Sequence, residues 1–184
     1  MLVIGSGGVG LNVVQGAKLA GAGRIIAADL VDKKLEFATE FGATHTINAK
    51  KDNVVHRVRE LTGGRGADYA FDAIGSEQTT LQIVDAIRNG GTAVIVGMAA
   101  MNVRAPITPY TMALQEKTLK GTLYGSIRPL VDMPQLVDLY MSGTLKIDQL
   151  VSRTSTIEEN LRNANAPRVA DSDDTGLGRH VPTL

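Results

Sequence analysis

Short apolar runs recur along the chain, each bounded by glycine or polar residues. Leu2–Ile4, Ile25–Ala28 and Tyr69–Phe71 are apolar or aromatic throughout, and Thr92–Val96 is rich in β-branched residues. Runs of this length without polar alternation are typical of strands that are buried on both faces of a parallel sheet. We therefore predict strands at these positions, with a further short strand at Thr44–Ile47.

Stretches with helical periodicity separate the predicted strands. Their apolar residues recur three or four positions apart, as on the buried face of a helix. The predicted helices cover Leu11–Ala20, Asp32–Phe41, Asn53–Leu61 with Asp52 as N-cap, and a segment marked by Leu81, Val84 and Ile87. Because strands that alternate with helices favour right-handed crossovers, the predicted fold is α/β, a doubly wound parallel sheet of about six strands with helices on both faces.

The second half of the chain has a less regular pattern. Prolines interrupt Asn102–Thr108, which limits this segment to an edge strand or a loop. Thr118–Tyr124 is compatible with a strand and Leu130–Met141 with a helix. Large apolar residues become scarce near the C-terminus, so we divide the chain into a folded domain, residues 1–152, and an atypical tail, residues 153–184, for which we expect poor packing or disorder.

A glycine-rich turn joins the first predicted strand to the first helix. In Gly5-Ser6-Gly7-Gly8-Val9-Gly10, Gly5 permits a tight turn, Gly7 lets the backbone approach a pyrophosphate, and Gly10 lets the helix lie close to the sheet. The N–H groups at the start of the helix, around Gly8 and Val9, would then face the phosphates. The turn therefore predicts a dinucleotide site, with an ordinary structural corner as the alternative.

An acidic residue follows the second predicted strand at the distance expected of a ribose ligand. Asp29 lies about 20 residues beyond the glycines, where a carboxylate can accept hydrogen bonds from the adenosine ribose hydroxyls. Because Leu30, Val31 and Asp32 follow, no arginine is there to pair with a 2′-phosphate, and the pattern favours NAD over NADP. The alternative is that Asp29 caps the next helix.

Charge and composition narrow the classes of partner. The 184 residues carry 19 basic and 19 acidic side chains, so the formal net charge is zero and nothing indicates a nucleic-acid surface. The sequence has no apolar run of about 18 residues and no signal segment, which predicts a soluble, cytoplasmic protein without a membrane partner. It has no cysteine and only three scattered histidines, so we expect no metal site in this chain.

Several of these motifs together make the chain similar to the coenzyme-binding (Rossmann) domain of zinc-type medium-chain alcohol dehydrogenases. The resemblance covers most of the chain, and beyond position 118 it is strongest to the long-chain branch that includes formaldehyde and aryl-alcohol dehydrogenases. It rests on Val3–Leu11, Ala28-Asp29, Glu40–Thr44, Gly66–Asp68, Asp72–Gly75, and Gly90-Gly91 before Val94–Gly97.

This resemblance implies roles for further residues in binding NAD. Asp29 and Lys34 would hold the adenosine ribose, and Ala73 and Ile74 would cover the adenine. Each has a plainer interpretation, since Lys34 could be a solvated helix lysine and Ile74 a packing residue. The residues that would border the nicotinamide, largely through backbone groups, are Val96, Gly97, Met98, Thr122 and Tyr124.

The resemblance also implies chemistry that this sequence lacks. In the family the zinc ligands and the proton relay lie in an upstream domain, and this sequence has no cysteine for a catalytic or a structural zinc. We therefore expect no catalytic residues here, NAD binding without alcohol oxidation, and zinc only in a full-length enzyme. A truncated or frame-altered gene would produce such a sequence. The alternative functions are a non-catalytic nucleotide-binding module and a methyltransferase with a similar glycine turn.

A homodimer is a further expectation from the resemblance. In the family, the edge segment that matches Asn102–Ile107 pairs with its symmetry mate and extends the sheet across the dimer. Pro106 removes one backbone donor from this segment, so a solvent-facing loop is the alternative.

Overall fold

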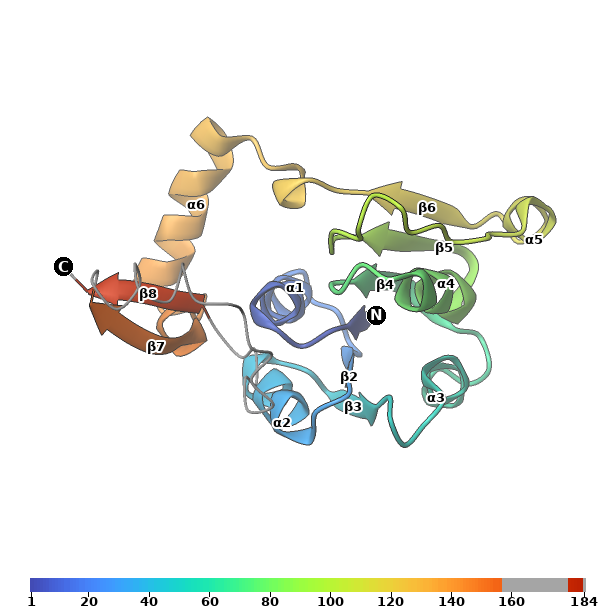
Figure 1. Cartoon of the computed structure of the whole chain (residues 1–184), viewed down its shortest axis with the longest axis horizontal. Coiled ribbons are helices and arrows are strands. Elements are labelled where there is room, and N and C mark those ends of the chain that lie inside the picture. The colour runs from blue at the N-terminus through green and yellow to red at the C-terminus, as the bar shows by residue number, and fades with distance from the viewer. Residues whose placement is uncertain (157–178, 184) are drawn as a thin grey trace.

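A single parallel sheet forms the centre of the protein in the computed structural model, which describes residues 1–156 and 179–183. The strand order is β3-β2-β1-β4-β5-β6 (Figure 1), and all neighbours are parallel. The strands are β1 (Leu2–Ile4), β2 (Ile26–Asp29), β3 (His45–Asn48), β4 (Ala67–Asp72), β5 (Ile87–Ile95) and β6 (Thr118–Gly121). This order reverses between β1 and β4, as in a doubly wound sheet, and it confirms the predicted fold class.

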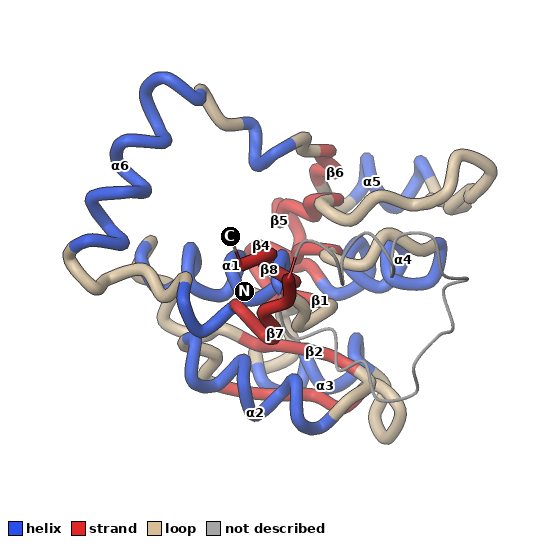
Figure 2. Tube along the Cα trace, turned by 60° about the vertical axis from the view of Figure 1, so that its left-hand side comes forward, coloured by secondary structure: helices blue, strands red, loops and turns tan. Residues whose placement is uncertain are grey.

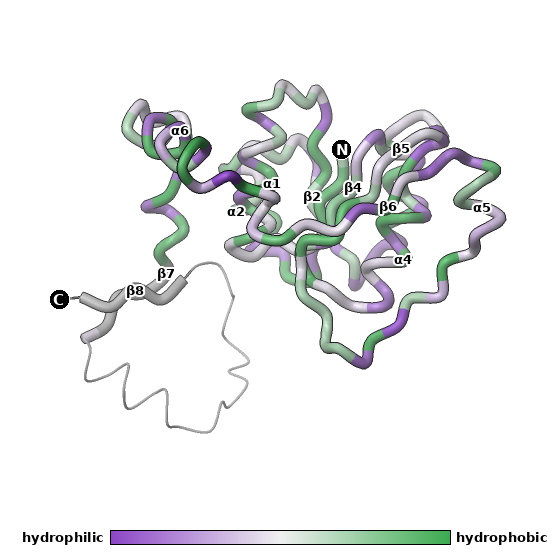
Figure 3. Tube along the Cα trace, turned by 90° about the horizontal axis from the view of Figure 1, so that it is seen from above, coloured by the Kyte–Doolittle hydropathy of each residue, from purple (hydrophilic) through white to green (hydrophobic). Residues whose placement is uncertain are grey.

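Helices cover both faces of the sheet. The helices α1 (Gly8–Leu19) and α2 (Asp32–Phe41) lie on one face, and α3 (Val54–Leu61) and α4 (Glu77–Ala86) lie on the other (Figure 1). Successive side chains of a strand point to opposite faces. Accordingly, Val3 packs in the cluster under α1 and α2, whereas Leu2 and Ile4 pack in the cluster under α3 and α4. Figure 3 shows these apolar strands at the centre of the domain.

The remaining elements lie outside this sheet. They are α5 (Pro109–Leu114), the 3₁₀ turns η1 (Tyr124–Ser126) and η2 (Asp148–Leu150), α6 (Pro129–Met141), and the parallel pair β7 (Val151–Thr156) and β8 (Arg179–Thr183). Figure 2 shows α6 standing apart from the sheet, and six of its large apolar side chains are 39% to 95% exposed. No helix in the described ranges is long and apolar enough to cross a bilayer. The division at residue 152 stays a prediction, because much of the tail, residues 157–178 and 184, lies outside the described residues.

Several predicted boundaries differ from the observed ones. The first helix starts at Gly8, within the glycine-rich turn, and not at Leu11. The N-cap of α3 is Asn53, whose side chain accepts a hydrogen bond from the His56 amide at 3.0 Å, so the prediction of Asp52 as the cap was wrong. Ile87 belongs to β5 and not to the preceding helix.

The predicted edge segment does not form a strand in the single chain. Residues 102–107 have irregular backbone, with turn hydrogen bonds such as that from the Ile107 amide to the Ala105 carbonyl at 3.0 Å. The strand at this side of the sheet is β6, which ends at Gly121 instead of continuing to Tyr124 as predicted. In the single chain this segment is therefore a loop, one of its two predicted states, and its pairing as an edge strand in a dimer stays a prediction.

Candidate functional site

The glycine-rich turn closes tightly between β1 and α1. Gly5 has a φ of +95°, and a Cβ atom there would lie 2.7 Å from Cγ1 of Ile74. A Cβ atom on Gly10 would lie 1.7 Å from the carbonyl oxygen of Gly5, so the first turn of α1 packs directly onto the end of β1. Glycine is therefore required at both positions. A Cβ atom on Gly8, in contrast, would meet open space.

The N-terminus of α1 is open to a ligand at this turn. Its N-cap, Gly7, has extended backbone, no side chain caps the helix, and its first turn holds no acidic residue. Val9 in this turn is 42% exposed, and the buried Oγ of Ser6 has no hydrogen-bond partner among the described residues. Free N–H groups and the positive end of the helix dipole favour an anion here, so this end of α1 can hold a phosphate group.

Asp29 links the ends of β1 and β2. Its Oδ2 accepts a hydrogen bond from the Ser6 amide at 2.8 Å, and its Oδ1 accepts one from the Val31 amide at 3.1 Å. Val31 is itself the N-cap of α2 and makes no side-chain cap, so Asp29 holds the turn before the helix and does not cap the helix. An ionised carboxylate has about four acceptor sites, which leaves about two for the hydroxyl groups of a ligand.

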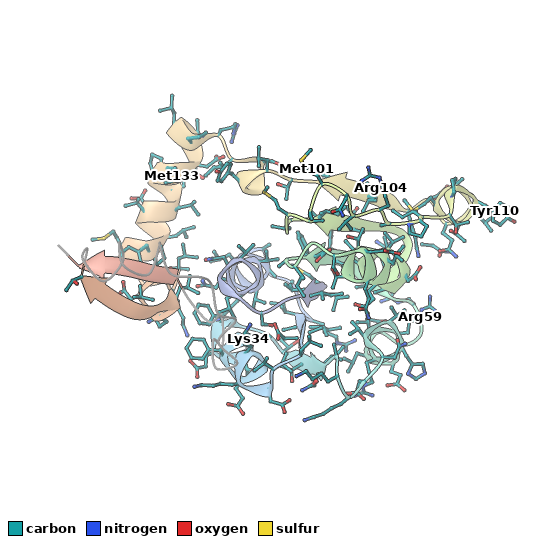
Figure 4. All side chains as sticks on the ribbon, viewed as in Figure 1. Lys34, Arg59, Met101, Arg104, Tyr110 and Met133 are labelled. Carbon is teal, nitrogen blue, oxygen red and sulfur yellow. The ribbon has the colours of Figure 1, made fainter. Side chains whose placement is uncertain are left out.

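Further predicted or exposed side chains lie just after the carboxyl ends of β2 and β4. Lys34, half-buried, lies in the first turn of α2 (Figure 4). Leu30 is 51% exposed directly after β2, and Ile74 is 46% exposed just after β4. Large apolar side chains exposed at strand ends suit the apolar faces of a bound ligand. We did not single out Leu30 from the sequence, where its signal is an apolar residue placed directly after the acidic one.

A buried carboxylate organises the loop after β4. Asp72 is fully buried, and its Oδ1 accepts hydrogen bonds from the amides of Ile74 and Gly75 at 3.0 and 2.9 Å. Its Oδ2 accepts hydrogen bonds from the hydroxyls of Thr79 and Thr80 on α4 at 2.9 and 3.0 Å. From the sequence we predicted a strand that ends at Phe71 and gave Asp72 no role, whereas Asp72 is the last residue of β4. Its sequence signal is an aspartate followed, seven and eight residues later, by two threonines.

The loops after β4 and β5 touch through their backbones. A Cβ atom on Gly97 would lie 2.4 Å from the carbonyl carbon of Ile74, and one on Gly75 would lie 2.7 Å from that of Gly97. The amides of Val96 and Gly97 both donate to the backbone carbonyl of Asp72, at 2.9 and 2.8 Å. The segment after β5 is therefore fixed against the segment after β4. The latter is also tied to β1 by the bond from the Ala73 amide to the carbonyl of Ile4 at 2.9 Å.

The remaining predicted residues lie at the ends of β5 and β6. Met98, directly after the Gly97 contact, is 86% exposed. Thr122 donates its amide to the carbonyl of Ile95 at 3.1 Å, which keeps it beside the end of β5. Tyr124 is 87% exposed and has a φ of +49°, a conformation that non-glycine residues rarely adopt.

The predicted site residues all lie at the carboxyl ends of the parallel strands. Register pairs Ile4 with both Ala28 and Asp72, and it pairs Ile95 with both Asp72 and Gly121. The carboxyl ends of these strands therefore lie in line, with the reversal of strand order between β1 and β4 at the centre. Ligands of open α/β sheets bind in this position.

A zinc site of the family type does not fit the residues present. Among the residues that the structure describes, no group of three or more His, Cys, Asp or Glu side chains could hold a metal ion. The complete sequence also contains no cysteine, and zinc sites of alcohol dehydrogenases rely on thiolate ligands. The described residues at the carboxyl ends of the strands therefore offer an open helix N-terminus, a carboxylate and exposed apolar side chains.

Comparison with known proteins gives one family. Residues 8–142 match the family model for zinc-binding dehydrogenases. The chain is 43% identical over 161 residues to an NDMA-dependent alcohol dehydrogenase from Amycolatopsis methanolica, an alignment that covers 86% of this chain and 43% of that protein.

Solved structures give the same result. The structure of benzyl alcohol dehydrogenase from Acinetobacter calcoaceticus superposes with a TM-score of 0.83 at 36% identity, covering 89% of this chain and 44% of that one. A putative zinc-binding dehydrogenase from Sinorhizobium meliloti bound to NADP also gives a TM-score of 0.83, at 28% identity, covering 92% of this chain and 49% of that one. The chain thus spans less than half the length of these relatives.

Proposed function

The chain belongs to the zinc-binding dehydrogenase family, and on that premise we propose that it binds NAD as the nucleotide-binding domain of an alcohol dehydrogenase. The observation that carries the proposal is the bond between the Asp29 carboxylate and the turn at the N-terminus of α1. Pyrophosphate and adenosine ribose are adjacent groups in a dinucleotide. A carboxylate tied to a phosphate-binding turn matches that adjacency.

Each part of NAD has a place in the proposal. The pyrophosphate lies against Gly7, Gly8 and Val9, the adenosine ribose against Asp29 and Lys34, the adenine between Leu30 and Ile74 beside Ala73, and the nicotinamide near Val96, Gly97, Met98, Thr122 and Tyr124. We propose NAD in preference to NADP, because a 2′-phosphate would meet the carboxylate of Asp29. Because one relative is bound to NADP, the affinity of this chain for NAD is best compared with its affinity for NADP.

The chemistry we propose for the complete enzyme is hydride transfer between an alcohol and an aldehyde. NAD supplies the hydride acceptor when it is bound, and the residues here bind and orient it. Because the family's zinc does not fit this chain, we derive no step through a metal and expect this chain alone to bind NAD without oxidising alcohols. A non-catalytic nucleotide-binding module is the second candidate. Both candidates predict no metal-binding group among the described residues, so activity with added zinc is the measurement that separates them.

We also propose a homodimer and a cytoplasmic location. The outer edge of β6 has no strand partner within the described sheet, and an open edge offers unpaired backbone groups to a second copy. Residues 102–107 would form a strand only in such a pair. Light scattering at micromolar concentration tests the dimer, and a monomeric mass would contradict it.

The cytoplasmic location of the protein is tested by cell fractionation.

The experiment that tests nucleotide binding is a calorimetric titration of the purified chain with NAD, NADP and S-adenosylmethionine. Saturable binding of NAD, tighter than that of NADP, would support the proposal. Absence of saturable NAD binding would overturn it, and binding of S-adenosylmethionine alone would favour a methyltransferase. Production of NADH from a primary alcohol after addition of zinc would contradict the expectation that this chain is inactive by itself.

A further inference from the structure

We propose that Asp72 is a positioning residue that couples the adenine side of the nucleotide site to its nicotinamide side. The inference rests on the proposed NAD site and adds to it a residue that would not touch the cofactor. Asp72 is fully buried at the end of β4, next to the reversal of strand order. Its side chain holds the loop on the adenine side, and its backbone carbonyl holds the segment on the nicotinamide side.

The carboxylate of Asp72 is held in one orientation. A buried carboxylate is costly unless donors surround it, and four donors bond this one: the amides of Ile74 and Gly75 and the hydroxyls of Thr79 and Thr80. The two hydroxyls come from α4, so the helix fixes Oδ2, and Oδ1 in turn fixes the loop. A hydrogen-bond path therefore runs from α4 through Asp72 to Ile74.

The contact between the two loops leaves no room for independent movement. Gly75 and Gly97 approach so closely that a Cβ atom on either would lie 2.7 Å or less from backbone atoms of the other loop. Close-packed backbone transmits displacement, because neither side can yield without losing hydrogen bonds or overlapping its neighbour. A shift of Ile74 is therefore expected to move Val96 and Gly97 as well.

Amide hydrogen exchange measured by NMR on the full chain tests this coupling. Thr80→Val removes one hydroxyl from Oδ2 and keeps the side-chain shape, whereas Asp72→Ala removes the whole carboxylate. If Asp72→Ala does not fold, the coupling is tested with Thr80→Val alone. The matched control is Thr39→Val, which removes a helix hydroxyl bonded to the Leu35 carbonyl at 3.2 Å.

Faster exchange at Ile74 and Gly75 together with Val96 and Gly97, absent from the Thr39→Val control, would support the coupling. The amides of Val96 and Gly97 bond to the backbone carbonyl of Asp72, which both substitutions keep. Faster exchange at these two amides would therefore show that the change at the first loop is passed to the second, because they lose no acceptor themselves. Faster exchange at Ile74 and Gly75 alone, or at neither pair, would overturn the inference. Asp72→Asn, which keeps an acceptor at Oδ1, should largely restore protection of both pairs.

Nucleotide affinity gives a second readout and separates this inference from the proposed function. We expect Asp72→Ala to raise the dissociation constant for NAD about tenfold, and that for AMP by less, because NAD would contact both loops. A purely structural role would lower the melting temperature and leave the affinity of the folded molecules unchanged. If the unaltered chain binds no NAD, the proposed function fails, while hydrogen exchange still decides the coupling.

Discussion

The backbone amide of Ser6 and the carboxylate of Asp29 are joined by a 2.8 Å hydrogen bond across 23 positions of the chain. Asp29 is therefore held by the glycine-rich turn as well as by its own strand. Its second oxygen is held by the Val31 amide at 3.1 Å, so the carboxylate is oriented before any ligand arrives. Such preorganisation reduces the ordering that binding would otherwise require.

Asp29→Ala should weaken NAD binding at least about tenfold, because it removes charge-assisted hydrogen bonds to the ribose and releases the Ser6 amide. NADP should lose less affinity, because the substitution also removes repulsion of its 2′-phosphate. Calorimetric titration of both nucleotides measures the two changes. The control is Asp138→Ala, an exposed carboxylate on α6. Equal NAD affinity in the two variants would contradict the assignment of Asp29.

Gly10→Ala should lower the free energy of unfolding by about 3 kcal/mol, because the new Cβ would lie 1.7 Å from the carbonyl oxygen of Gly5 and the helix must move away from β1. Urea denaturation measures this change. Gly16→Ala, in the same helix and facing open space, is the control and should stabilise the protein by about 0.5–1 kcal/mol. Similar effects of the two substitutions would show that the close approach is not present.

Gln15→Leu should lower the free energy of unfolding by about 2 kcal/mol. The buried side chain of Gln15 donates to the Lys146 carbonyl at 3.0 Å and accepts from the Lys146 amide at 2.7 Å, so the substitution leaves both backbone groups without this partner. Faster hydrogen exchange at the Lys146 amide should accompany the loss. Gln149→Ala, at an exposed position, serves as the control. Unchanged exchange at Lys146 would contradict the predicted role of Gln15.

Acid should destabilise the fold partly through Asp68. Its pKa is lowered by the hydrogen bond from Arg88, which joins β4 to β5 with an Nε to Oδ1 distance of 2.5 Å. Because the folded pKa lies below that of the unfolded chain, the contribution is present above about pH 4 and is lost as the pH falls through the folded pKa. Asp68→Asn should flatten the dependence of melting temperature on pH below about pH 4, whereas Asp138→Asn should not. An unaltered slope in Asp68→Asn would show that the pair contributes nothing.

The fold was largely predictable because its signals are local. Burial is indicated directly by a uniformly apolar run such as Leu2–Ile4, and by apolar residues that recur three or four positions apart, as in Asp32–Phe41. The observed β1 and α2 have those same bounds. Ile87 was misplaced for a related reason. A buried residue between a helix and a strand fits both patterns, and Ile87 is 3% exposed.

The details that were missed depend on geometry that a linear pattern does not contain. Asp52 and Asn53 are both good capping residues, but the Asp52 amide is bonded to the Asn48 carbonyl in the preceding turn, and Asn53 has the extended backbone of an N-cap. The role of Asp72 depends on where α4 begins relative to β4, because only then do Thr79 and Thr80 face its carboxylate. The parts of the candidate site carried by glycine spacing and by Asp29 needed no such knowledge.

The exposed apolar side chains of α6 offer a route to self-association other than the proposed pairing at the edge of the sheet. Leu130, Met133 and Met141 are 95%, 52% and 76% exposed, and Figure 4 labels Met133 on this helix. Exposed large apolar side chains of this kind promote non-specific clustering as concentration rises. A dimeric mass alone would therefore not identify pairing at the edge of the sheet. Only a dimer that survives substitution of Leu130 and Met133 by glutamate would report on that edge.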